Sequence, residues 1–426
     1  MKNQTNDRLF CKSFILLLLG QISSLVGNYS LKFALSMYIL DLTGSASVFS
    51  IITAATMLPM ILLSPFGGVL ADRADRRRVM VLLDTLSGCI LLGCGLMLTF
   101  GRGIIFEAGG ELYIVGGLLV IMSIIGAFES PTVQACVPQI LSGDNVIRGN
   151  AAVSQVSAIA ALVTPFIGSL IYTAFGINFV LFGTTVCFLL TAGFELFIHL
   201  EPVNTNSSSG VRATISRDFR EGMNFLRCDR PELLLLLLVA ASVSLFLAGI
   251  AVVGFPYIVR TLLGLSTEHY AISESASALA AIAGGIFVGV MANRLRAPHL
   301  TYIIVGFGAL LFPLAVIFLL PTDTAVRFGF ITVIFCLCQF GCSIFSTLSI
   351  TLIQAKTPDH LMGKVMSYVY TLSLCAQPVG QLLFGWLLDR YSSELSAIFL
   401  GCGLVIGLIG VLTARYIGRI DRDDCK

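Results

Sequence analysis

The chain of 426 residues is 56% hydrophobic and only 12% charged, with a formal net charge of +2 and a mean hydropathy of +0.93. A soluble globular domain carries about twice this fraction of charged residues, so the composition excludes that class. The small net charge also gives no reason to expect a nucleic-acid partner. The positions of the charges along the chain are therefore more informative than their sum.

Apolar segments of roughly 20 residues recur along the whole sequence, and each is long enough to cross a bilayer as a helix. The length of the segments and the lack of two-residue alternation favour helices over the strands of a barrel. We therefore predict an all-α membrane protein. In chain order, the predicted transmembrane helices are residues 13–40, 46–71, 79–100, 112–137, 148–174, 177–199, 232–263, 268–292, 299–320, 325–354, 364–388 and 395–417.

Most of the 26 lysines and arginines lie at one set of span ends, which also includes the two chain termini. Basic residues mark the cytoplasmic side of a membrane protein, so we expect a multi-pass protein of the cell membrane with both termini in the cytoplasm. Basic residues also precede the first apolar segment, as in a signal peptide. That segment continues to about residue 40 without a prompt small-x-small cleavage site, so we expect a retained helix.

The long polar break in the chain covers residues 201–231. It begins with an Asn-, Ser- and Gly-rich stretch, which is a flexible linker composition. Residues 216–228 then have charged and apolar side chains available for opposite faces, which predicts a short amphipathic helix on the cytoplasmic membrane surface. The break separates six predicted spans from six, giving an N-terminal bundle at residues 1–200 and a C-terminal bundle at residues 232–426.

The two halves resemble each other in sequence. The segment Gly68–Arg73 is similar to Gly289–Arg294, and Gln134–Pro138 is similar to Gln354–Pro358, at nearly the same offset along the chain. Two independent matches at one offset indicate two copies of a six-helix unit.

The densest charge in the chain follows the second predicted span. Six charged residues occur among the seven from Asp72 to Arg78, and Gly67 and Gly68 precede them. The pattern Gly-x-x-x-Asp-Arg-x-x-Arg-Arg resembles the signature loop of the major facilitator superfamily, with Asp75 where that family usually has glycine. The resemblance implies two pseudo-symmetric six-helix bundles, a substrate site near mid-membrane between them, and secondary transport by alternating access.

The resemblance also implies that the signature loop is a conformational latch. Asp72 is expected to approach the start of the eleventh span, residues 363–367, where a carboxylate is favoured by about 0.3–1 kcal/mol. Asp84 follows Arg77 by seven residues, so both are expected on one helix face. In the second half Asn293 replaces the aspartate, which predicts a weaker counterpart. The expected latch residues are Gly68, Asp72, Arg73, Arg76, Arg77 and Asp84.

Other segments are similar to the drug-exporter branch of the same superfamily, which includes macrolide efflux proteins. They are Leu42–Ala46 after the first span and Ser130-Pro131 leading to Pro138. In the fifth span, Thr164–Gly168 partly resembles an antiporter motif and marks Pro165 and Gly168. The fourth span lacks an arginine that many proton-coupled exporters carry. The resemblance implies export of amphipathic, drug-like small molecules.

A few charged residues lie inside the predicted spans. A charge at mid-bilayer costs about 2.5–3.5 kcal/mol, so it normally faces the bundle interior or a wet cavity. Lys32 and Glu129 are the deepest, and the resemblance implies that both line the cavity. Glu129 is then the candidate proton carrier and Lys32 would favour anionic or zwitterionic substrates. The alternative is that each serves packing alone. Glu195 is expected to reach the cytoplasmic surface, and Glu274 to pair with Arg260.

The sequence shows no catalytic, cofactor or metal-binding motif, so we expect a monomeric transporter with no cofactor and no metal. Its expected partners are a small-molecule substrate and the lipid bilayer. The enzyme alternative is a membrane-embedded prenyltransferase, because Asp72-x-x-Asp75 superficially fits a magnesium-diphosphate site. A receptor or scaffold without transport is a third class. Within transport, the alternatives are export of an endogenous metabolite such as a siderophore and movement of a lysophospholipid.

Overall fold

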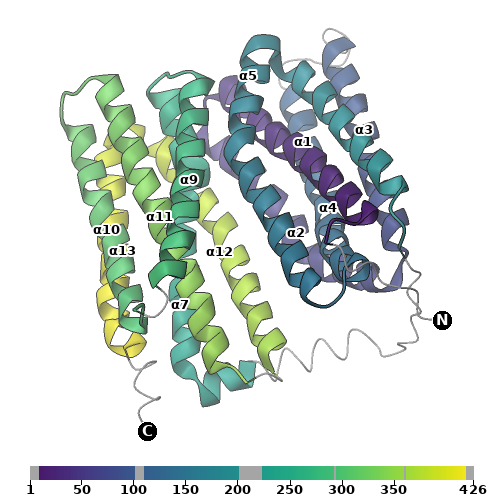
Figure 1. Cartoon of the computed structure of the whole chain (residues 1–426). Helices are drawn as coiled ribbons and strands as arrows, with labels where there is room; N and C mark the ends of the chain where they lie inside the picture. Colours follow the sequence, from purple (N-terminus) through teal and green to yellow (C-terminus); the bar gives the residue numbers. More distant parts are fainter. Residues whose placement is uncertain (1–8, 101–109, 201–222, 292–293, 359–360, 419–426) are drawn as a thin grey trace. The chain divides into compact units, whose positions relative to one another are not determined.

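The computed structural model describes residues 9–100, 110–200, 223–291, 294–358 and 361–418, and nearly all of them are helical (Figure 1). A hydrocarbon environment offers no hydrogen-bond partners, and a helix satisfies its backbone groups within its own segment. The helices of the first half are α1 (Lys12–Thr43), α2 (Ala46–Arg73), α3 (Arg76–Phe100), α4 (Gly110–Ile140) and α5 (Asp144–Leu196).

The second half begins with a single π-helical turn, η1 (Phe225–Asp229), in the region where an amphipathic helix was predicted. Its Phe225 and Leu226 are buried and Arg227 is exposed, while residues 216–222 lie outside the described part of the chain. The seventh span is composite, because π-helical turns interrupt the α-helix. Its segments are α7 (Pro231–Ala248), η2 (Gly249–Gly254), α8 (Phe255–Tyr257) and η3 (Ile258–Leu262).

The remaining spans are single helices. They are α9 (Thr267–Met291), α10 (Ala297–Leu319), α11 (Thr324–Lys356), α12 (Met362–Arg390) and α13 (Leu395–Ile417), with the short η5 (Ser392–Glu394) before the last. Among the described residues, 11 helices are long and apolar enough to cross a membrane. One of these, α5, contains two predicted spans. The prediction of an all-α protein with about twelve membrane spans is therefore confirmed.

A backbone turn at Gly176 divides α5 into two arms, residues 144–175 and 177–196. Gly176 has φ 77° and ψ −178°, a conformation that is essentially restricted to glycine because a side chain would collide with the backbone. The turn falls where the fifth and sixth predicted spans meet. A single glycine thus allows the chain to end one span and begin the next.

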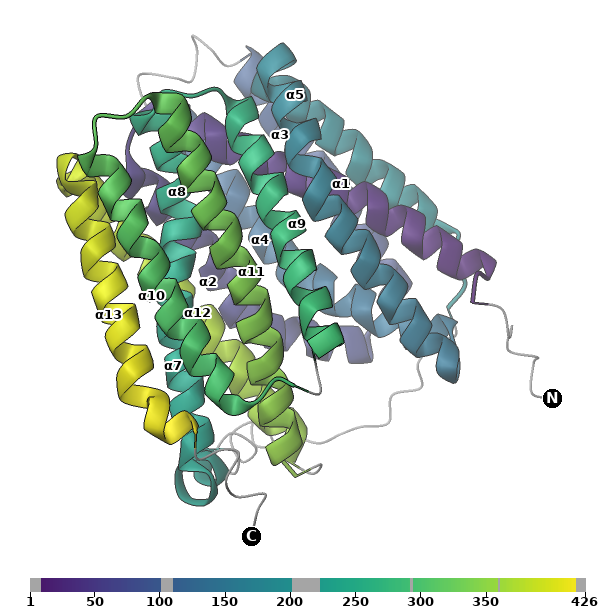
Figure 2. The same cartoon turned by 60° about the vertical axis from the view of Figure 1, so that its left-hand side comes forward.

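The helix contacts divide the chain into two compact units. Unit 1 comprises residues 1–44, 55–206 and 265–275. Within it, α1 packs along α5, and α3 packs against both α5 and α4 (Figure 2). The first turns of α9, Thr267–Ser275, belong to this unit although the rest of α9 does not.

Unit 2 comprises residues 45–54, 207–264 and 276–426. Within it, α12 packs on α7, and α10 packs against α13 and α11 (Figure 1). The first turns of α2, Ala46–Ala54, belong to this unit. Each unit therefore includes the beginning of one helix whose remainder belongs to the other unit.

Glycines allow the helices of each unit to pack with their backbones in near contact. In unit 1, a Cβ atom on Gly168 would lie 3.2 Å from Ser30 Cα, so α5 rests directly on α1. In unit 2, a Cβ on Gly380 of α12 would overlap the Leu245 carbonyl oxygen of α7. The two units thus use a glycine at the corresponding helix crossing, consistent with the repeat in the sequence.

We predict that Gly176→Ala destabilises the protein by about 1–3 kcal/mol, because alanine would have to occupy a conformation that costs this much. Thermal unfolding of the protein in detergent measures the effect. Gly183→Ala is the matched control in the second arm of α5, since a Cβ there meets nothing within 4 Å. Equal unfolding midpoints for the two variants would contradict the role assigned to the turn.

Candidate functional site

The signature loop joins three helices of unit 1 through Arg76. Its Nε donates a hydrogen bond to the Ala71 carbonyl at 2.6 Å, and Nη1 donates to the Ala135 carbonyl at 2.8 Å. Ala71 lies in the last turn of α2, where the carbonyls carry partial negative charge, and Ala135 lies in the C-terminal part of α4. Arg76, in the first turn of α3, therefore stabilises the end of α2 and connects it to α4.

The next two arginines differ sharply in their surroundings. Arg77 Nη2 donates a hydrogen bond to the carbonyl of Leu196, the last residue of α5. The Arg78 side chain is 87% exposed and pairs only locally with Asp75, with Nε 3.2 Å from Oδ2. An exposed pair of this kind contributes about 0–1 kcal/mol. Arg76 and Arg77, but not Arg78, thus connect α3 to neighbouring helix ends.

A close backbone approach between α2 and α4 occurs at Gly67, just before the loop. A Cβ there would overlap the Ala127 carbonyl of α4 and lie 3.1 Å from Phe128 Cα. A Cβ on Gly68 would meet no described atom within 4 Å. The backbone of Asp72 and Arg73 completes α2, but their side chains lie outside the described structure, as does Asn293. The latch therefore stays a prediction.

Three acidic side chains from different helices form a cluster inside unit 1. They are Asp84 of α3, Glu129 of α4 and Glu195 of the second arm of α5, and all three pairs interact electrostatically. Asp84 is completely buried and Glu195 is 2% exposed, whereas Glu129 is half-buried. The prediction that Glu195 reaches the membrane surface is wrong. The sequence predicts that Asp84 lies in a charge network with Arg77. In the structure its interaction partners are Glu129 and Glu195.

A hydrogen bond within the cluster would require a proton. Asp84 and Glu195 lie close enough to interact through their side chains, and two carboxyl groups can share a hydrogen bond only if one of them is protonated. Neither Asp84 oxygen, nor Glu195 Oε2, has a hydrogen-bond donor among the described residues. Glu129 Oε1 accepts a hydrogen bond of 3.2 Å from Ser24 Oγ of α1. We name Asp84, Glu129 and Glu195 the acidic cluster.

One further group, a cysteine thiol, is close to the acidic cluster. Cys136 of α4 interacts electrostatically with both Glu195 and Arg76, and its sulfur lies 3.3 Å from Met80 Sδ. In the part of the chain that the structure describes, no group of His, Cys, Asp and Glu residues has the geometry to hold a metal ion.

Lys32 interacts with a different acidic residue from those of the acidic cluster. The Lys32 side chain of α1 is exposed and interacts electrostatically with Glu274 of α9, within unit 1. Tyr270 hydrogen-bonds to the same carboxylate, and its ring stacks on Phe33 with centroids 5.5 Å apart. Lys32 and Glu129 thus have different partners, and the positive charge of Lys32 faces a carboxylate.

The span-five motif has a packing role in the structure. Pro165 lies inside the first arm of α5, and Gly168 follows one turn later at the contact with Ser30 of α1. Thr164 beside them is completely buried. Gly168 therefore lies at a close contact between α5 and α1.

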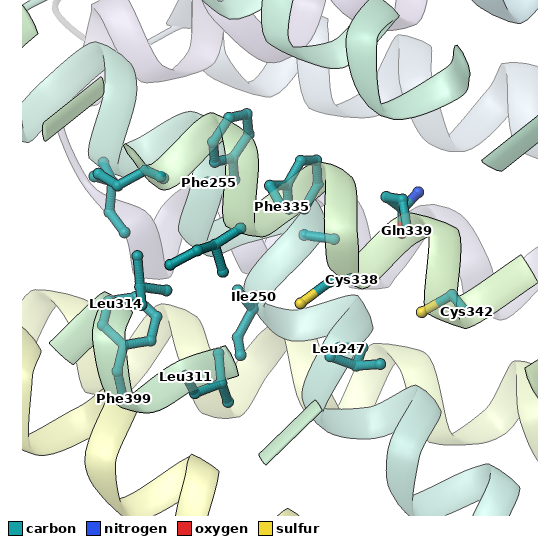
Figure 3. Close-up of a pocket in the computed structure, with 14 residues that line it drawn as sticks. Leu247, Ile250, Phe255, Leu311, Leu314, Phe335, Cys338, Gln339, Cys342 and Phe399 are labelled. Carbon is teal, nitrogen blue, oxygen red and sulfur yellow. The ribbon is translucent and has the colours of Figure 1, made fainter. Parts of the chain in front are cut away.

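A small apolar pocket lies within unit 2 (Figure 3). Its volume is about 30 Å³, room for roughly two water molecules. Phe255 and Phe335 stack at its edge with ring centroids 4.3 Å apart, and Gln339 contributes an amide. Its other walls come from apolar residues of the composite seventh span and of α10, α11 and α13. The pocket is too small for a drug-sized ligand in this conformation.

The architecture defines an all-α, multi-pass membrane protein, and comparison with known proteins identifies its family. Residues 17–380 match the model of the Major Facilitator Superfamily, and the chain belongs to this family. It is a transporter and not an enzyme, so the prenyltransferase alternative is wrong.

Two relatives are efflux proteins. Macrolide efflux protein A of Streptococcus pyogenes is 25% identical over 409 residues, which cover 96% of each chain. The multidrug efflux pump Tap of Mycobacterium tuberculosis is 27% identical over 423 residues, covering 94% of this chain and 92% of the relative.

Solved structures share the fold at low sequence identity. The nucleoside transporter NupG aligns with a TM-score of 0.74 and 11% identity, covering 96% of this chain and 99% of that one. A bacterial homologue of the iron transporter ferroportin, in an inward-facing state, aligns with a TM-score of 0.70 and 16% identity, covering 94% and 98%.

We predict that Arg76→Met lowers the free energy of unfolding by roughly 3 kcal/mol, because two charge-assisted hydrogen bonds to backbone carbonyls are lost. Denaturant unfolding in detergent micelles measures the change. Arg78→Met is the control, and its effect should stay within about 1 kcal/mol. Similar losses from both substitutions would show that the two carbonyl contacts of Arg76 contribute little.

Proposed function

We propose that this protein is a proton-coupled secondary transporter that exports amphipathic small molecules by alternating access. It acts as a monomer in the cell membrane, with both termini in the cytoplasm. The two efflux relatives, which match over nearly the whole chain, support efflux and drug-like substrates. The distribution of lysine and arginine supports the orientation.

The observation that carries the proposed proton coupling is the acidic cluster. Ionising all its members would place three like charges in an apolar bundle, at a high cost in free energy. Gain and loss of a proton therefore changes the electrostatics of α3, α4 and α5 together. If a proton gradient is to drive a conformational change, binding of the proton must alter the interactions between helices of the transporter.

The members of the acidic cluster differ in access. Glu129 is half-buried, whereas Asp84 and Glu195 are buried. Glu129 is thus the member that can exchange a proton with water, and the buried pair is the site that holds it. In this proposal Glu129 keeps the proton-carrying role that the sequence predicts, and Asp84 and Glu195 share that role.

The signature loop has a further role in this proposal, which rests on the family resemblance. Gly68, Asp72 and Arg73 form the moving part of a cytoplasmic latch. Arg76 and Arg77 hold α2, α4 and α5 in place around it, as their hydrogen bonds to backbone carbonyls suggest.

The experiment that tests the function measures the accumulation of macrolides and other amphipathic compounds in cells with and without the gene. We expect lower accumulation of at least one compound class in the expressing cells, and loss of this difference when a protonophore is added. A panel in which no compound is excluded would contradict the efflux proposal. Exclusion that persists with the protonophore would contradict proton coupling.

We predict that Glu129→Gln and Asp84→Asn each abolish accumulation driven by a pH gradient in proteoliposomes. A difference of one pH unit supports about a tenfold substrate gradient per proton, so about this factor should be lost at that gradient. Glu268→Gln, which alters an exposed acid at the start of α9, is the control and should keep the gradient. An unchanged pH-driven gradient in both cluster variants would rule out the cluster as the proton site.

A further inference from the structure

The start of α2 is held by a carboxylate from the end of α12. Within unit 2, the Ala46 N–H donates to Asp389 Oδ1 at 2.7 Å, and the Ser47 N–H donates to Asp389 Oδ2 at 2.9 Å. The Ser45 hydroxyl donates to the same Oδ2 at 2.6 Å. The first amides of a helix have no partner inside the helix, so Asp389 completes the start of α2.

The contact extends along the first turns of α2. The Val48 N–H donates to Ser45 Oγ at 3.2 Å, and the Ser47 hydroxyl donates to the Gly385 carbonyl at 3.1 Å. A Cβ on Gly385 would overlap the side chain of Ser50, which is 1% exposed. Both hydrogen bonding and close packing therefore attach the start of α2 to α12.

The same short sequence pattern occurs at the end of both helices. Gly385-x-x-x-Asp389-Arg390 at the end of α12 repeats Gly68-x-x-x-Asp72-Arg73 at the end of α2. The second and eleventh spans end on opposite faces of the membrane. In the proposed orientation, the copy at the end of α2 therefore lies at the cytoplasmic face of the membrane. The copy at the end of α12 lies at the outer face.

We propose that Asp389 is a lock that keeps the outer side closed and is released in each transport cycle. The inference rests on the alternating access proposed above. Only Ala46–Ala54 of α2 belongs to unit 2, and the helix continues from residue 55 as part of unit 1. A relative movement of the two units thus pulls on the contact between α2 and Asp389. The negative charge of Asp389 at a helix N-terminus favours the closed state.

The first test links the two sides of the contact. In a Ser45→Cys and Asp389→Cys double variant, a reducible bifunctional methanethiosulfonate should stop transport, and reduction should restore it. The control is the double variant Asp41→Cys and Tyr172→Cys. It replaces a hydrogen-bonded pair 2.8 Å apart on α1 and α5, and both helices belong to unit 1 along their whole length, so linking should not stop transport. Unchanged transport by the linked Ser45–Asp389 pair would overturn the proposal.

The second test needs no known substrate, so it separates a failure of this inference from a failure of the proposed function. Ser50→Cys is labelled with a membrane-impermeant maleimide from the outer face, and peptide mass mapping identifies the labelled site. Asp389→Asn should increase the labelling rate about tenfold, because a charge-assisted contact is lost. The control Thr191→Cys, 1% exposed within unit 1, should label equally slowly in both backgrounds. An unchanged rate at Ser50→Cys would overturn the lock.

Discussion

The absence of hydrogen-bond partners in the hydrocarbon core of a membrane governs this structure. A backbone amide or carbonyl left unpaired in that environment costs several kcal/mol, so the chain forms long helices. The constraint is most demanding at helix ends, where four amides or carbonyls have no partner within the helix. Here charged side chains satisfy some of them. Arg76 bonds to the Ala71 carbonyl at the end of α2, and Asp389 bonds to the start of α2.

Polar groups in an apolar environment are normally paired with a hydrogen-bonding or charged partner, and the acidic cluster departs from this rule. Asp84 is completely buried and has only acidic neighbours among the groups that act on it, Glu129 and Glu195. A structural carboxylate would be paired with a cation or with several donors, because an unpaired buried charge is strongly destabilising. A cluster with no such compensation is costly for stability alone. That cost is understandable if the cluster binds and releases a proton during transport.

Helix packing and helix capping have different consequences for movement. Contacts such as that of Gly168 with Ser30 bring backbones together inside one unit and depend on shape. The packing energy of such contacts falls steeply as the helices separate, so each unit tends to move as a rigid body. The Asp389 contact depends on charge and hydrogen bonds at a helix end, whose partners water can replace. Such a contact can open and close repeatedly at moderate cost.

The sequence alone determined the number and limits of the spans, because membrane insertion depends on the apolar character of each continuous segment. It also identified the signature pattern and the unusual acids, since both are local features. Only the tertiary structure decided which side chains meet. Glu195 lies one residue before the end of α5, where a carboxylate is expected to reach water, yet packing buries it beside Asp84. Close packing falls on Gly67 and not on Gly68, and Asp389 reaches the start of a helix more than 340 residues earlier in the chain. Such contacts depend on the rotation and depth of each helix in its bundle. These are set by many packing interactions at once, which hydropathy and short motifs do not record.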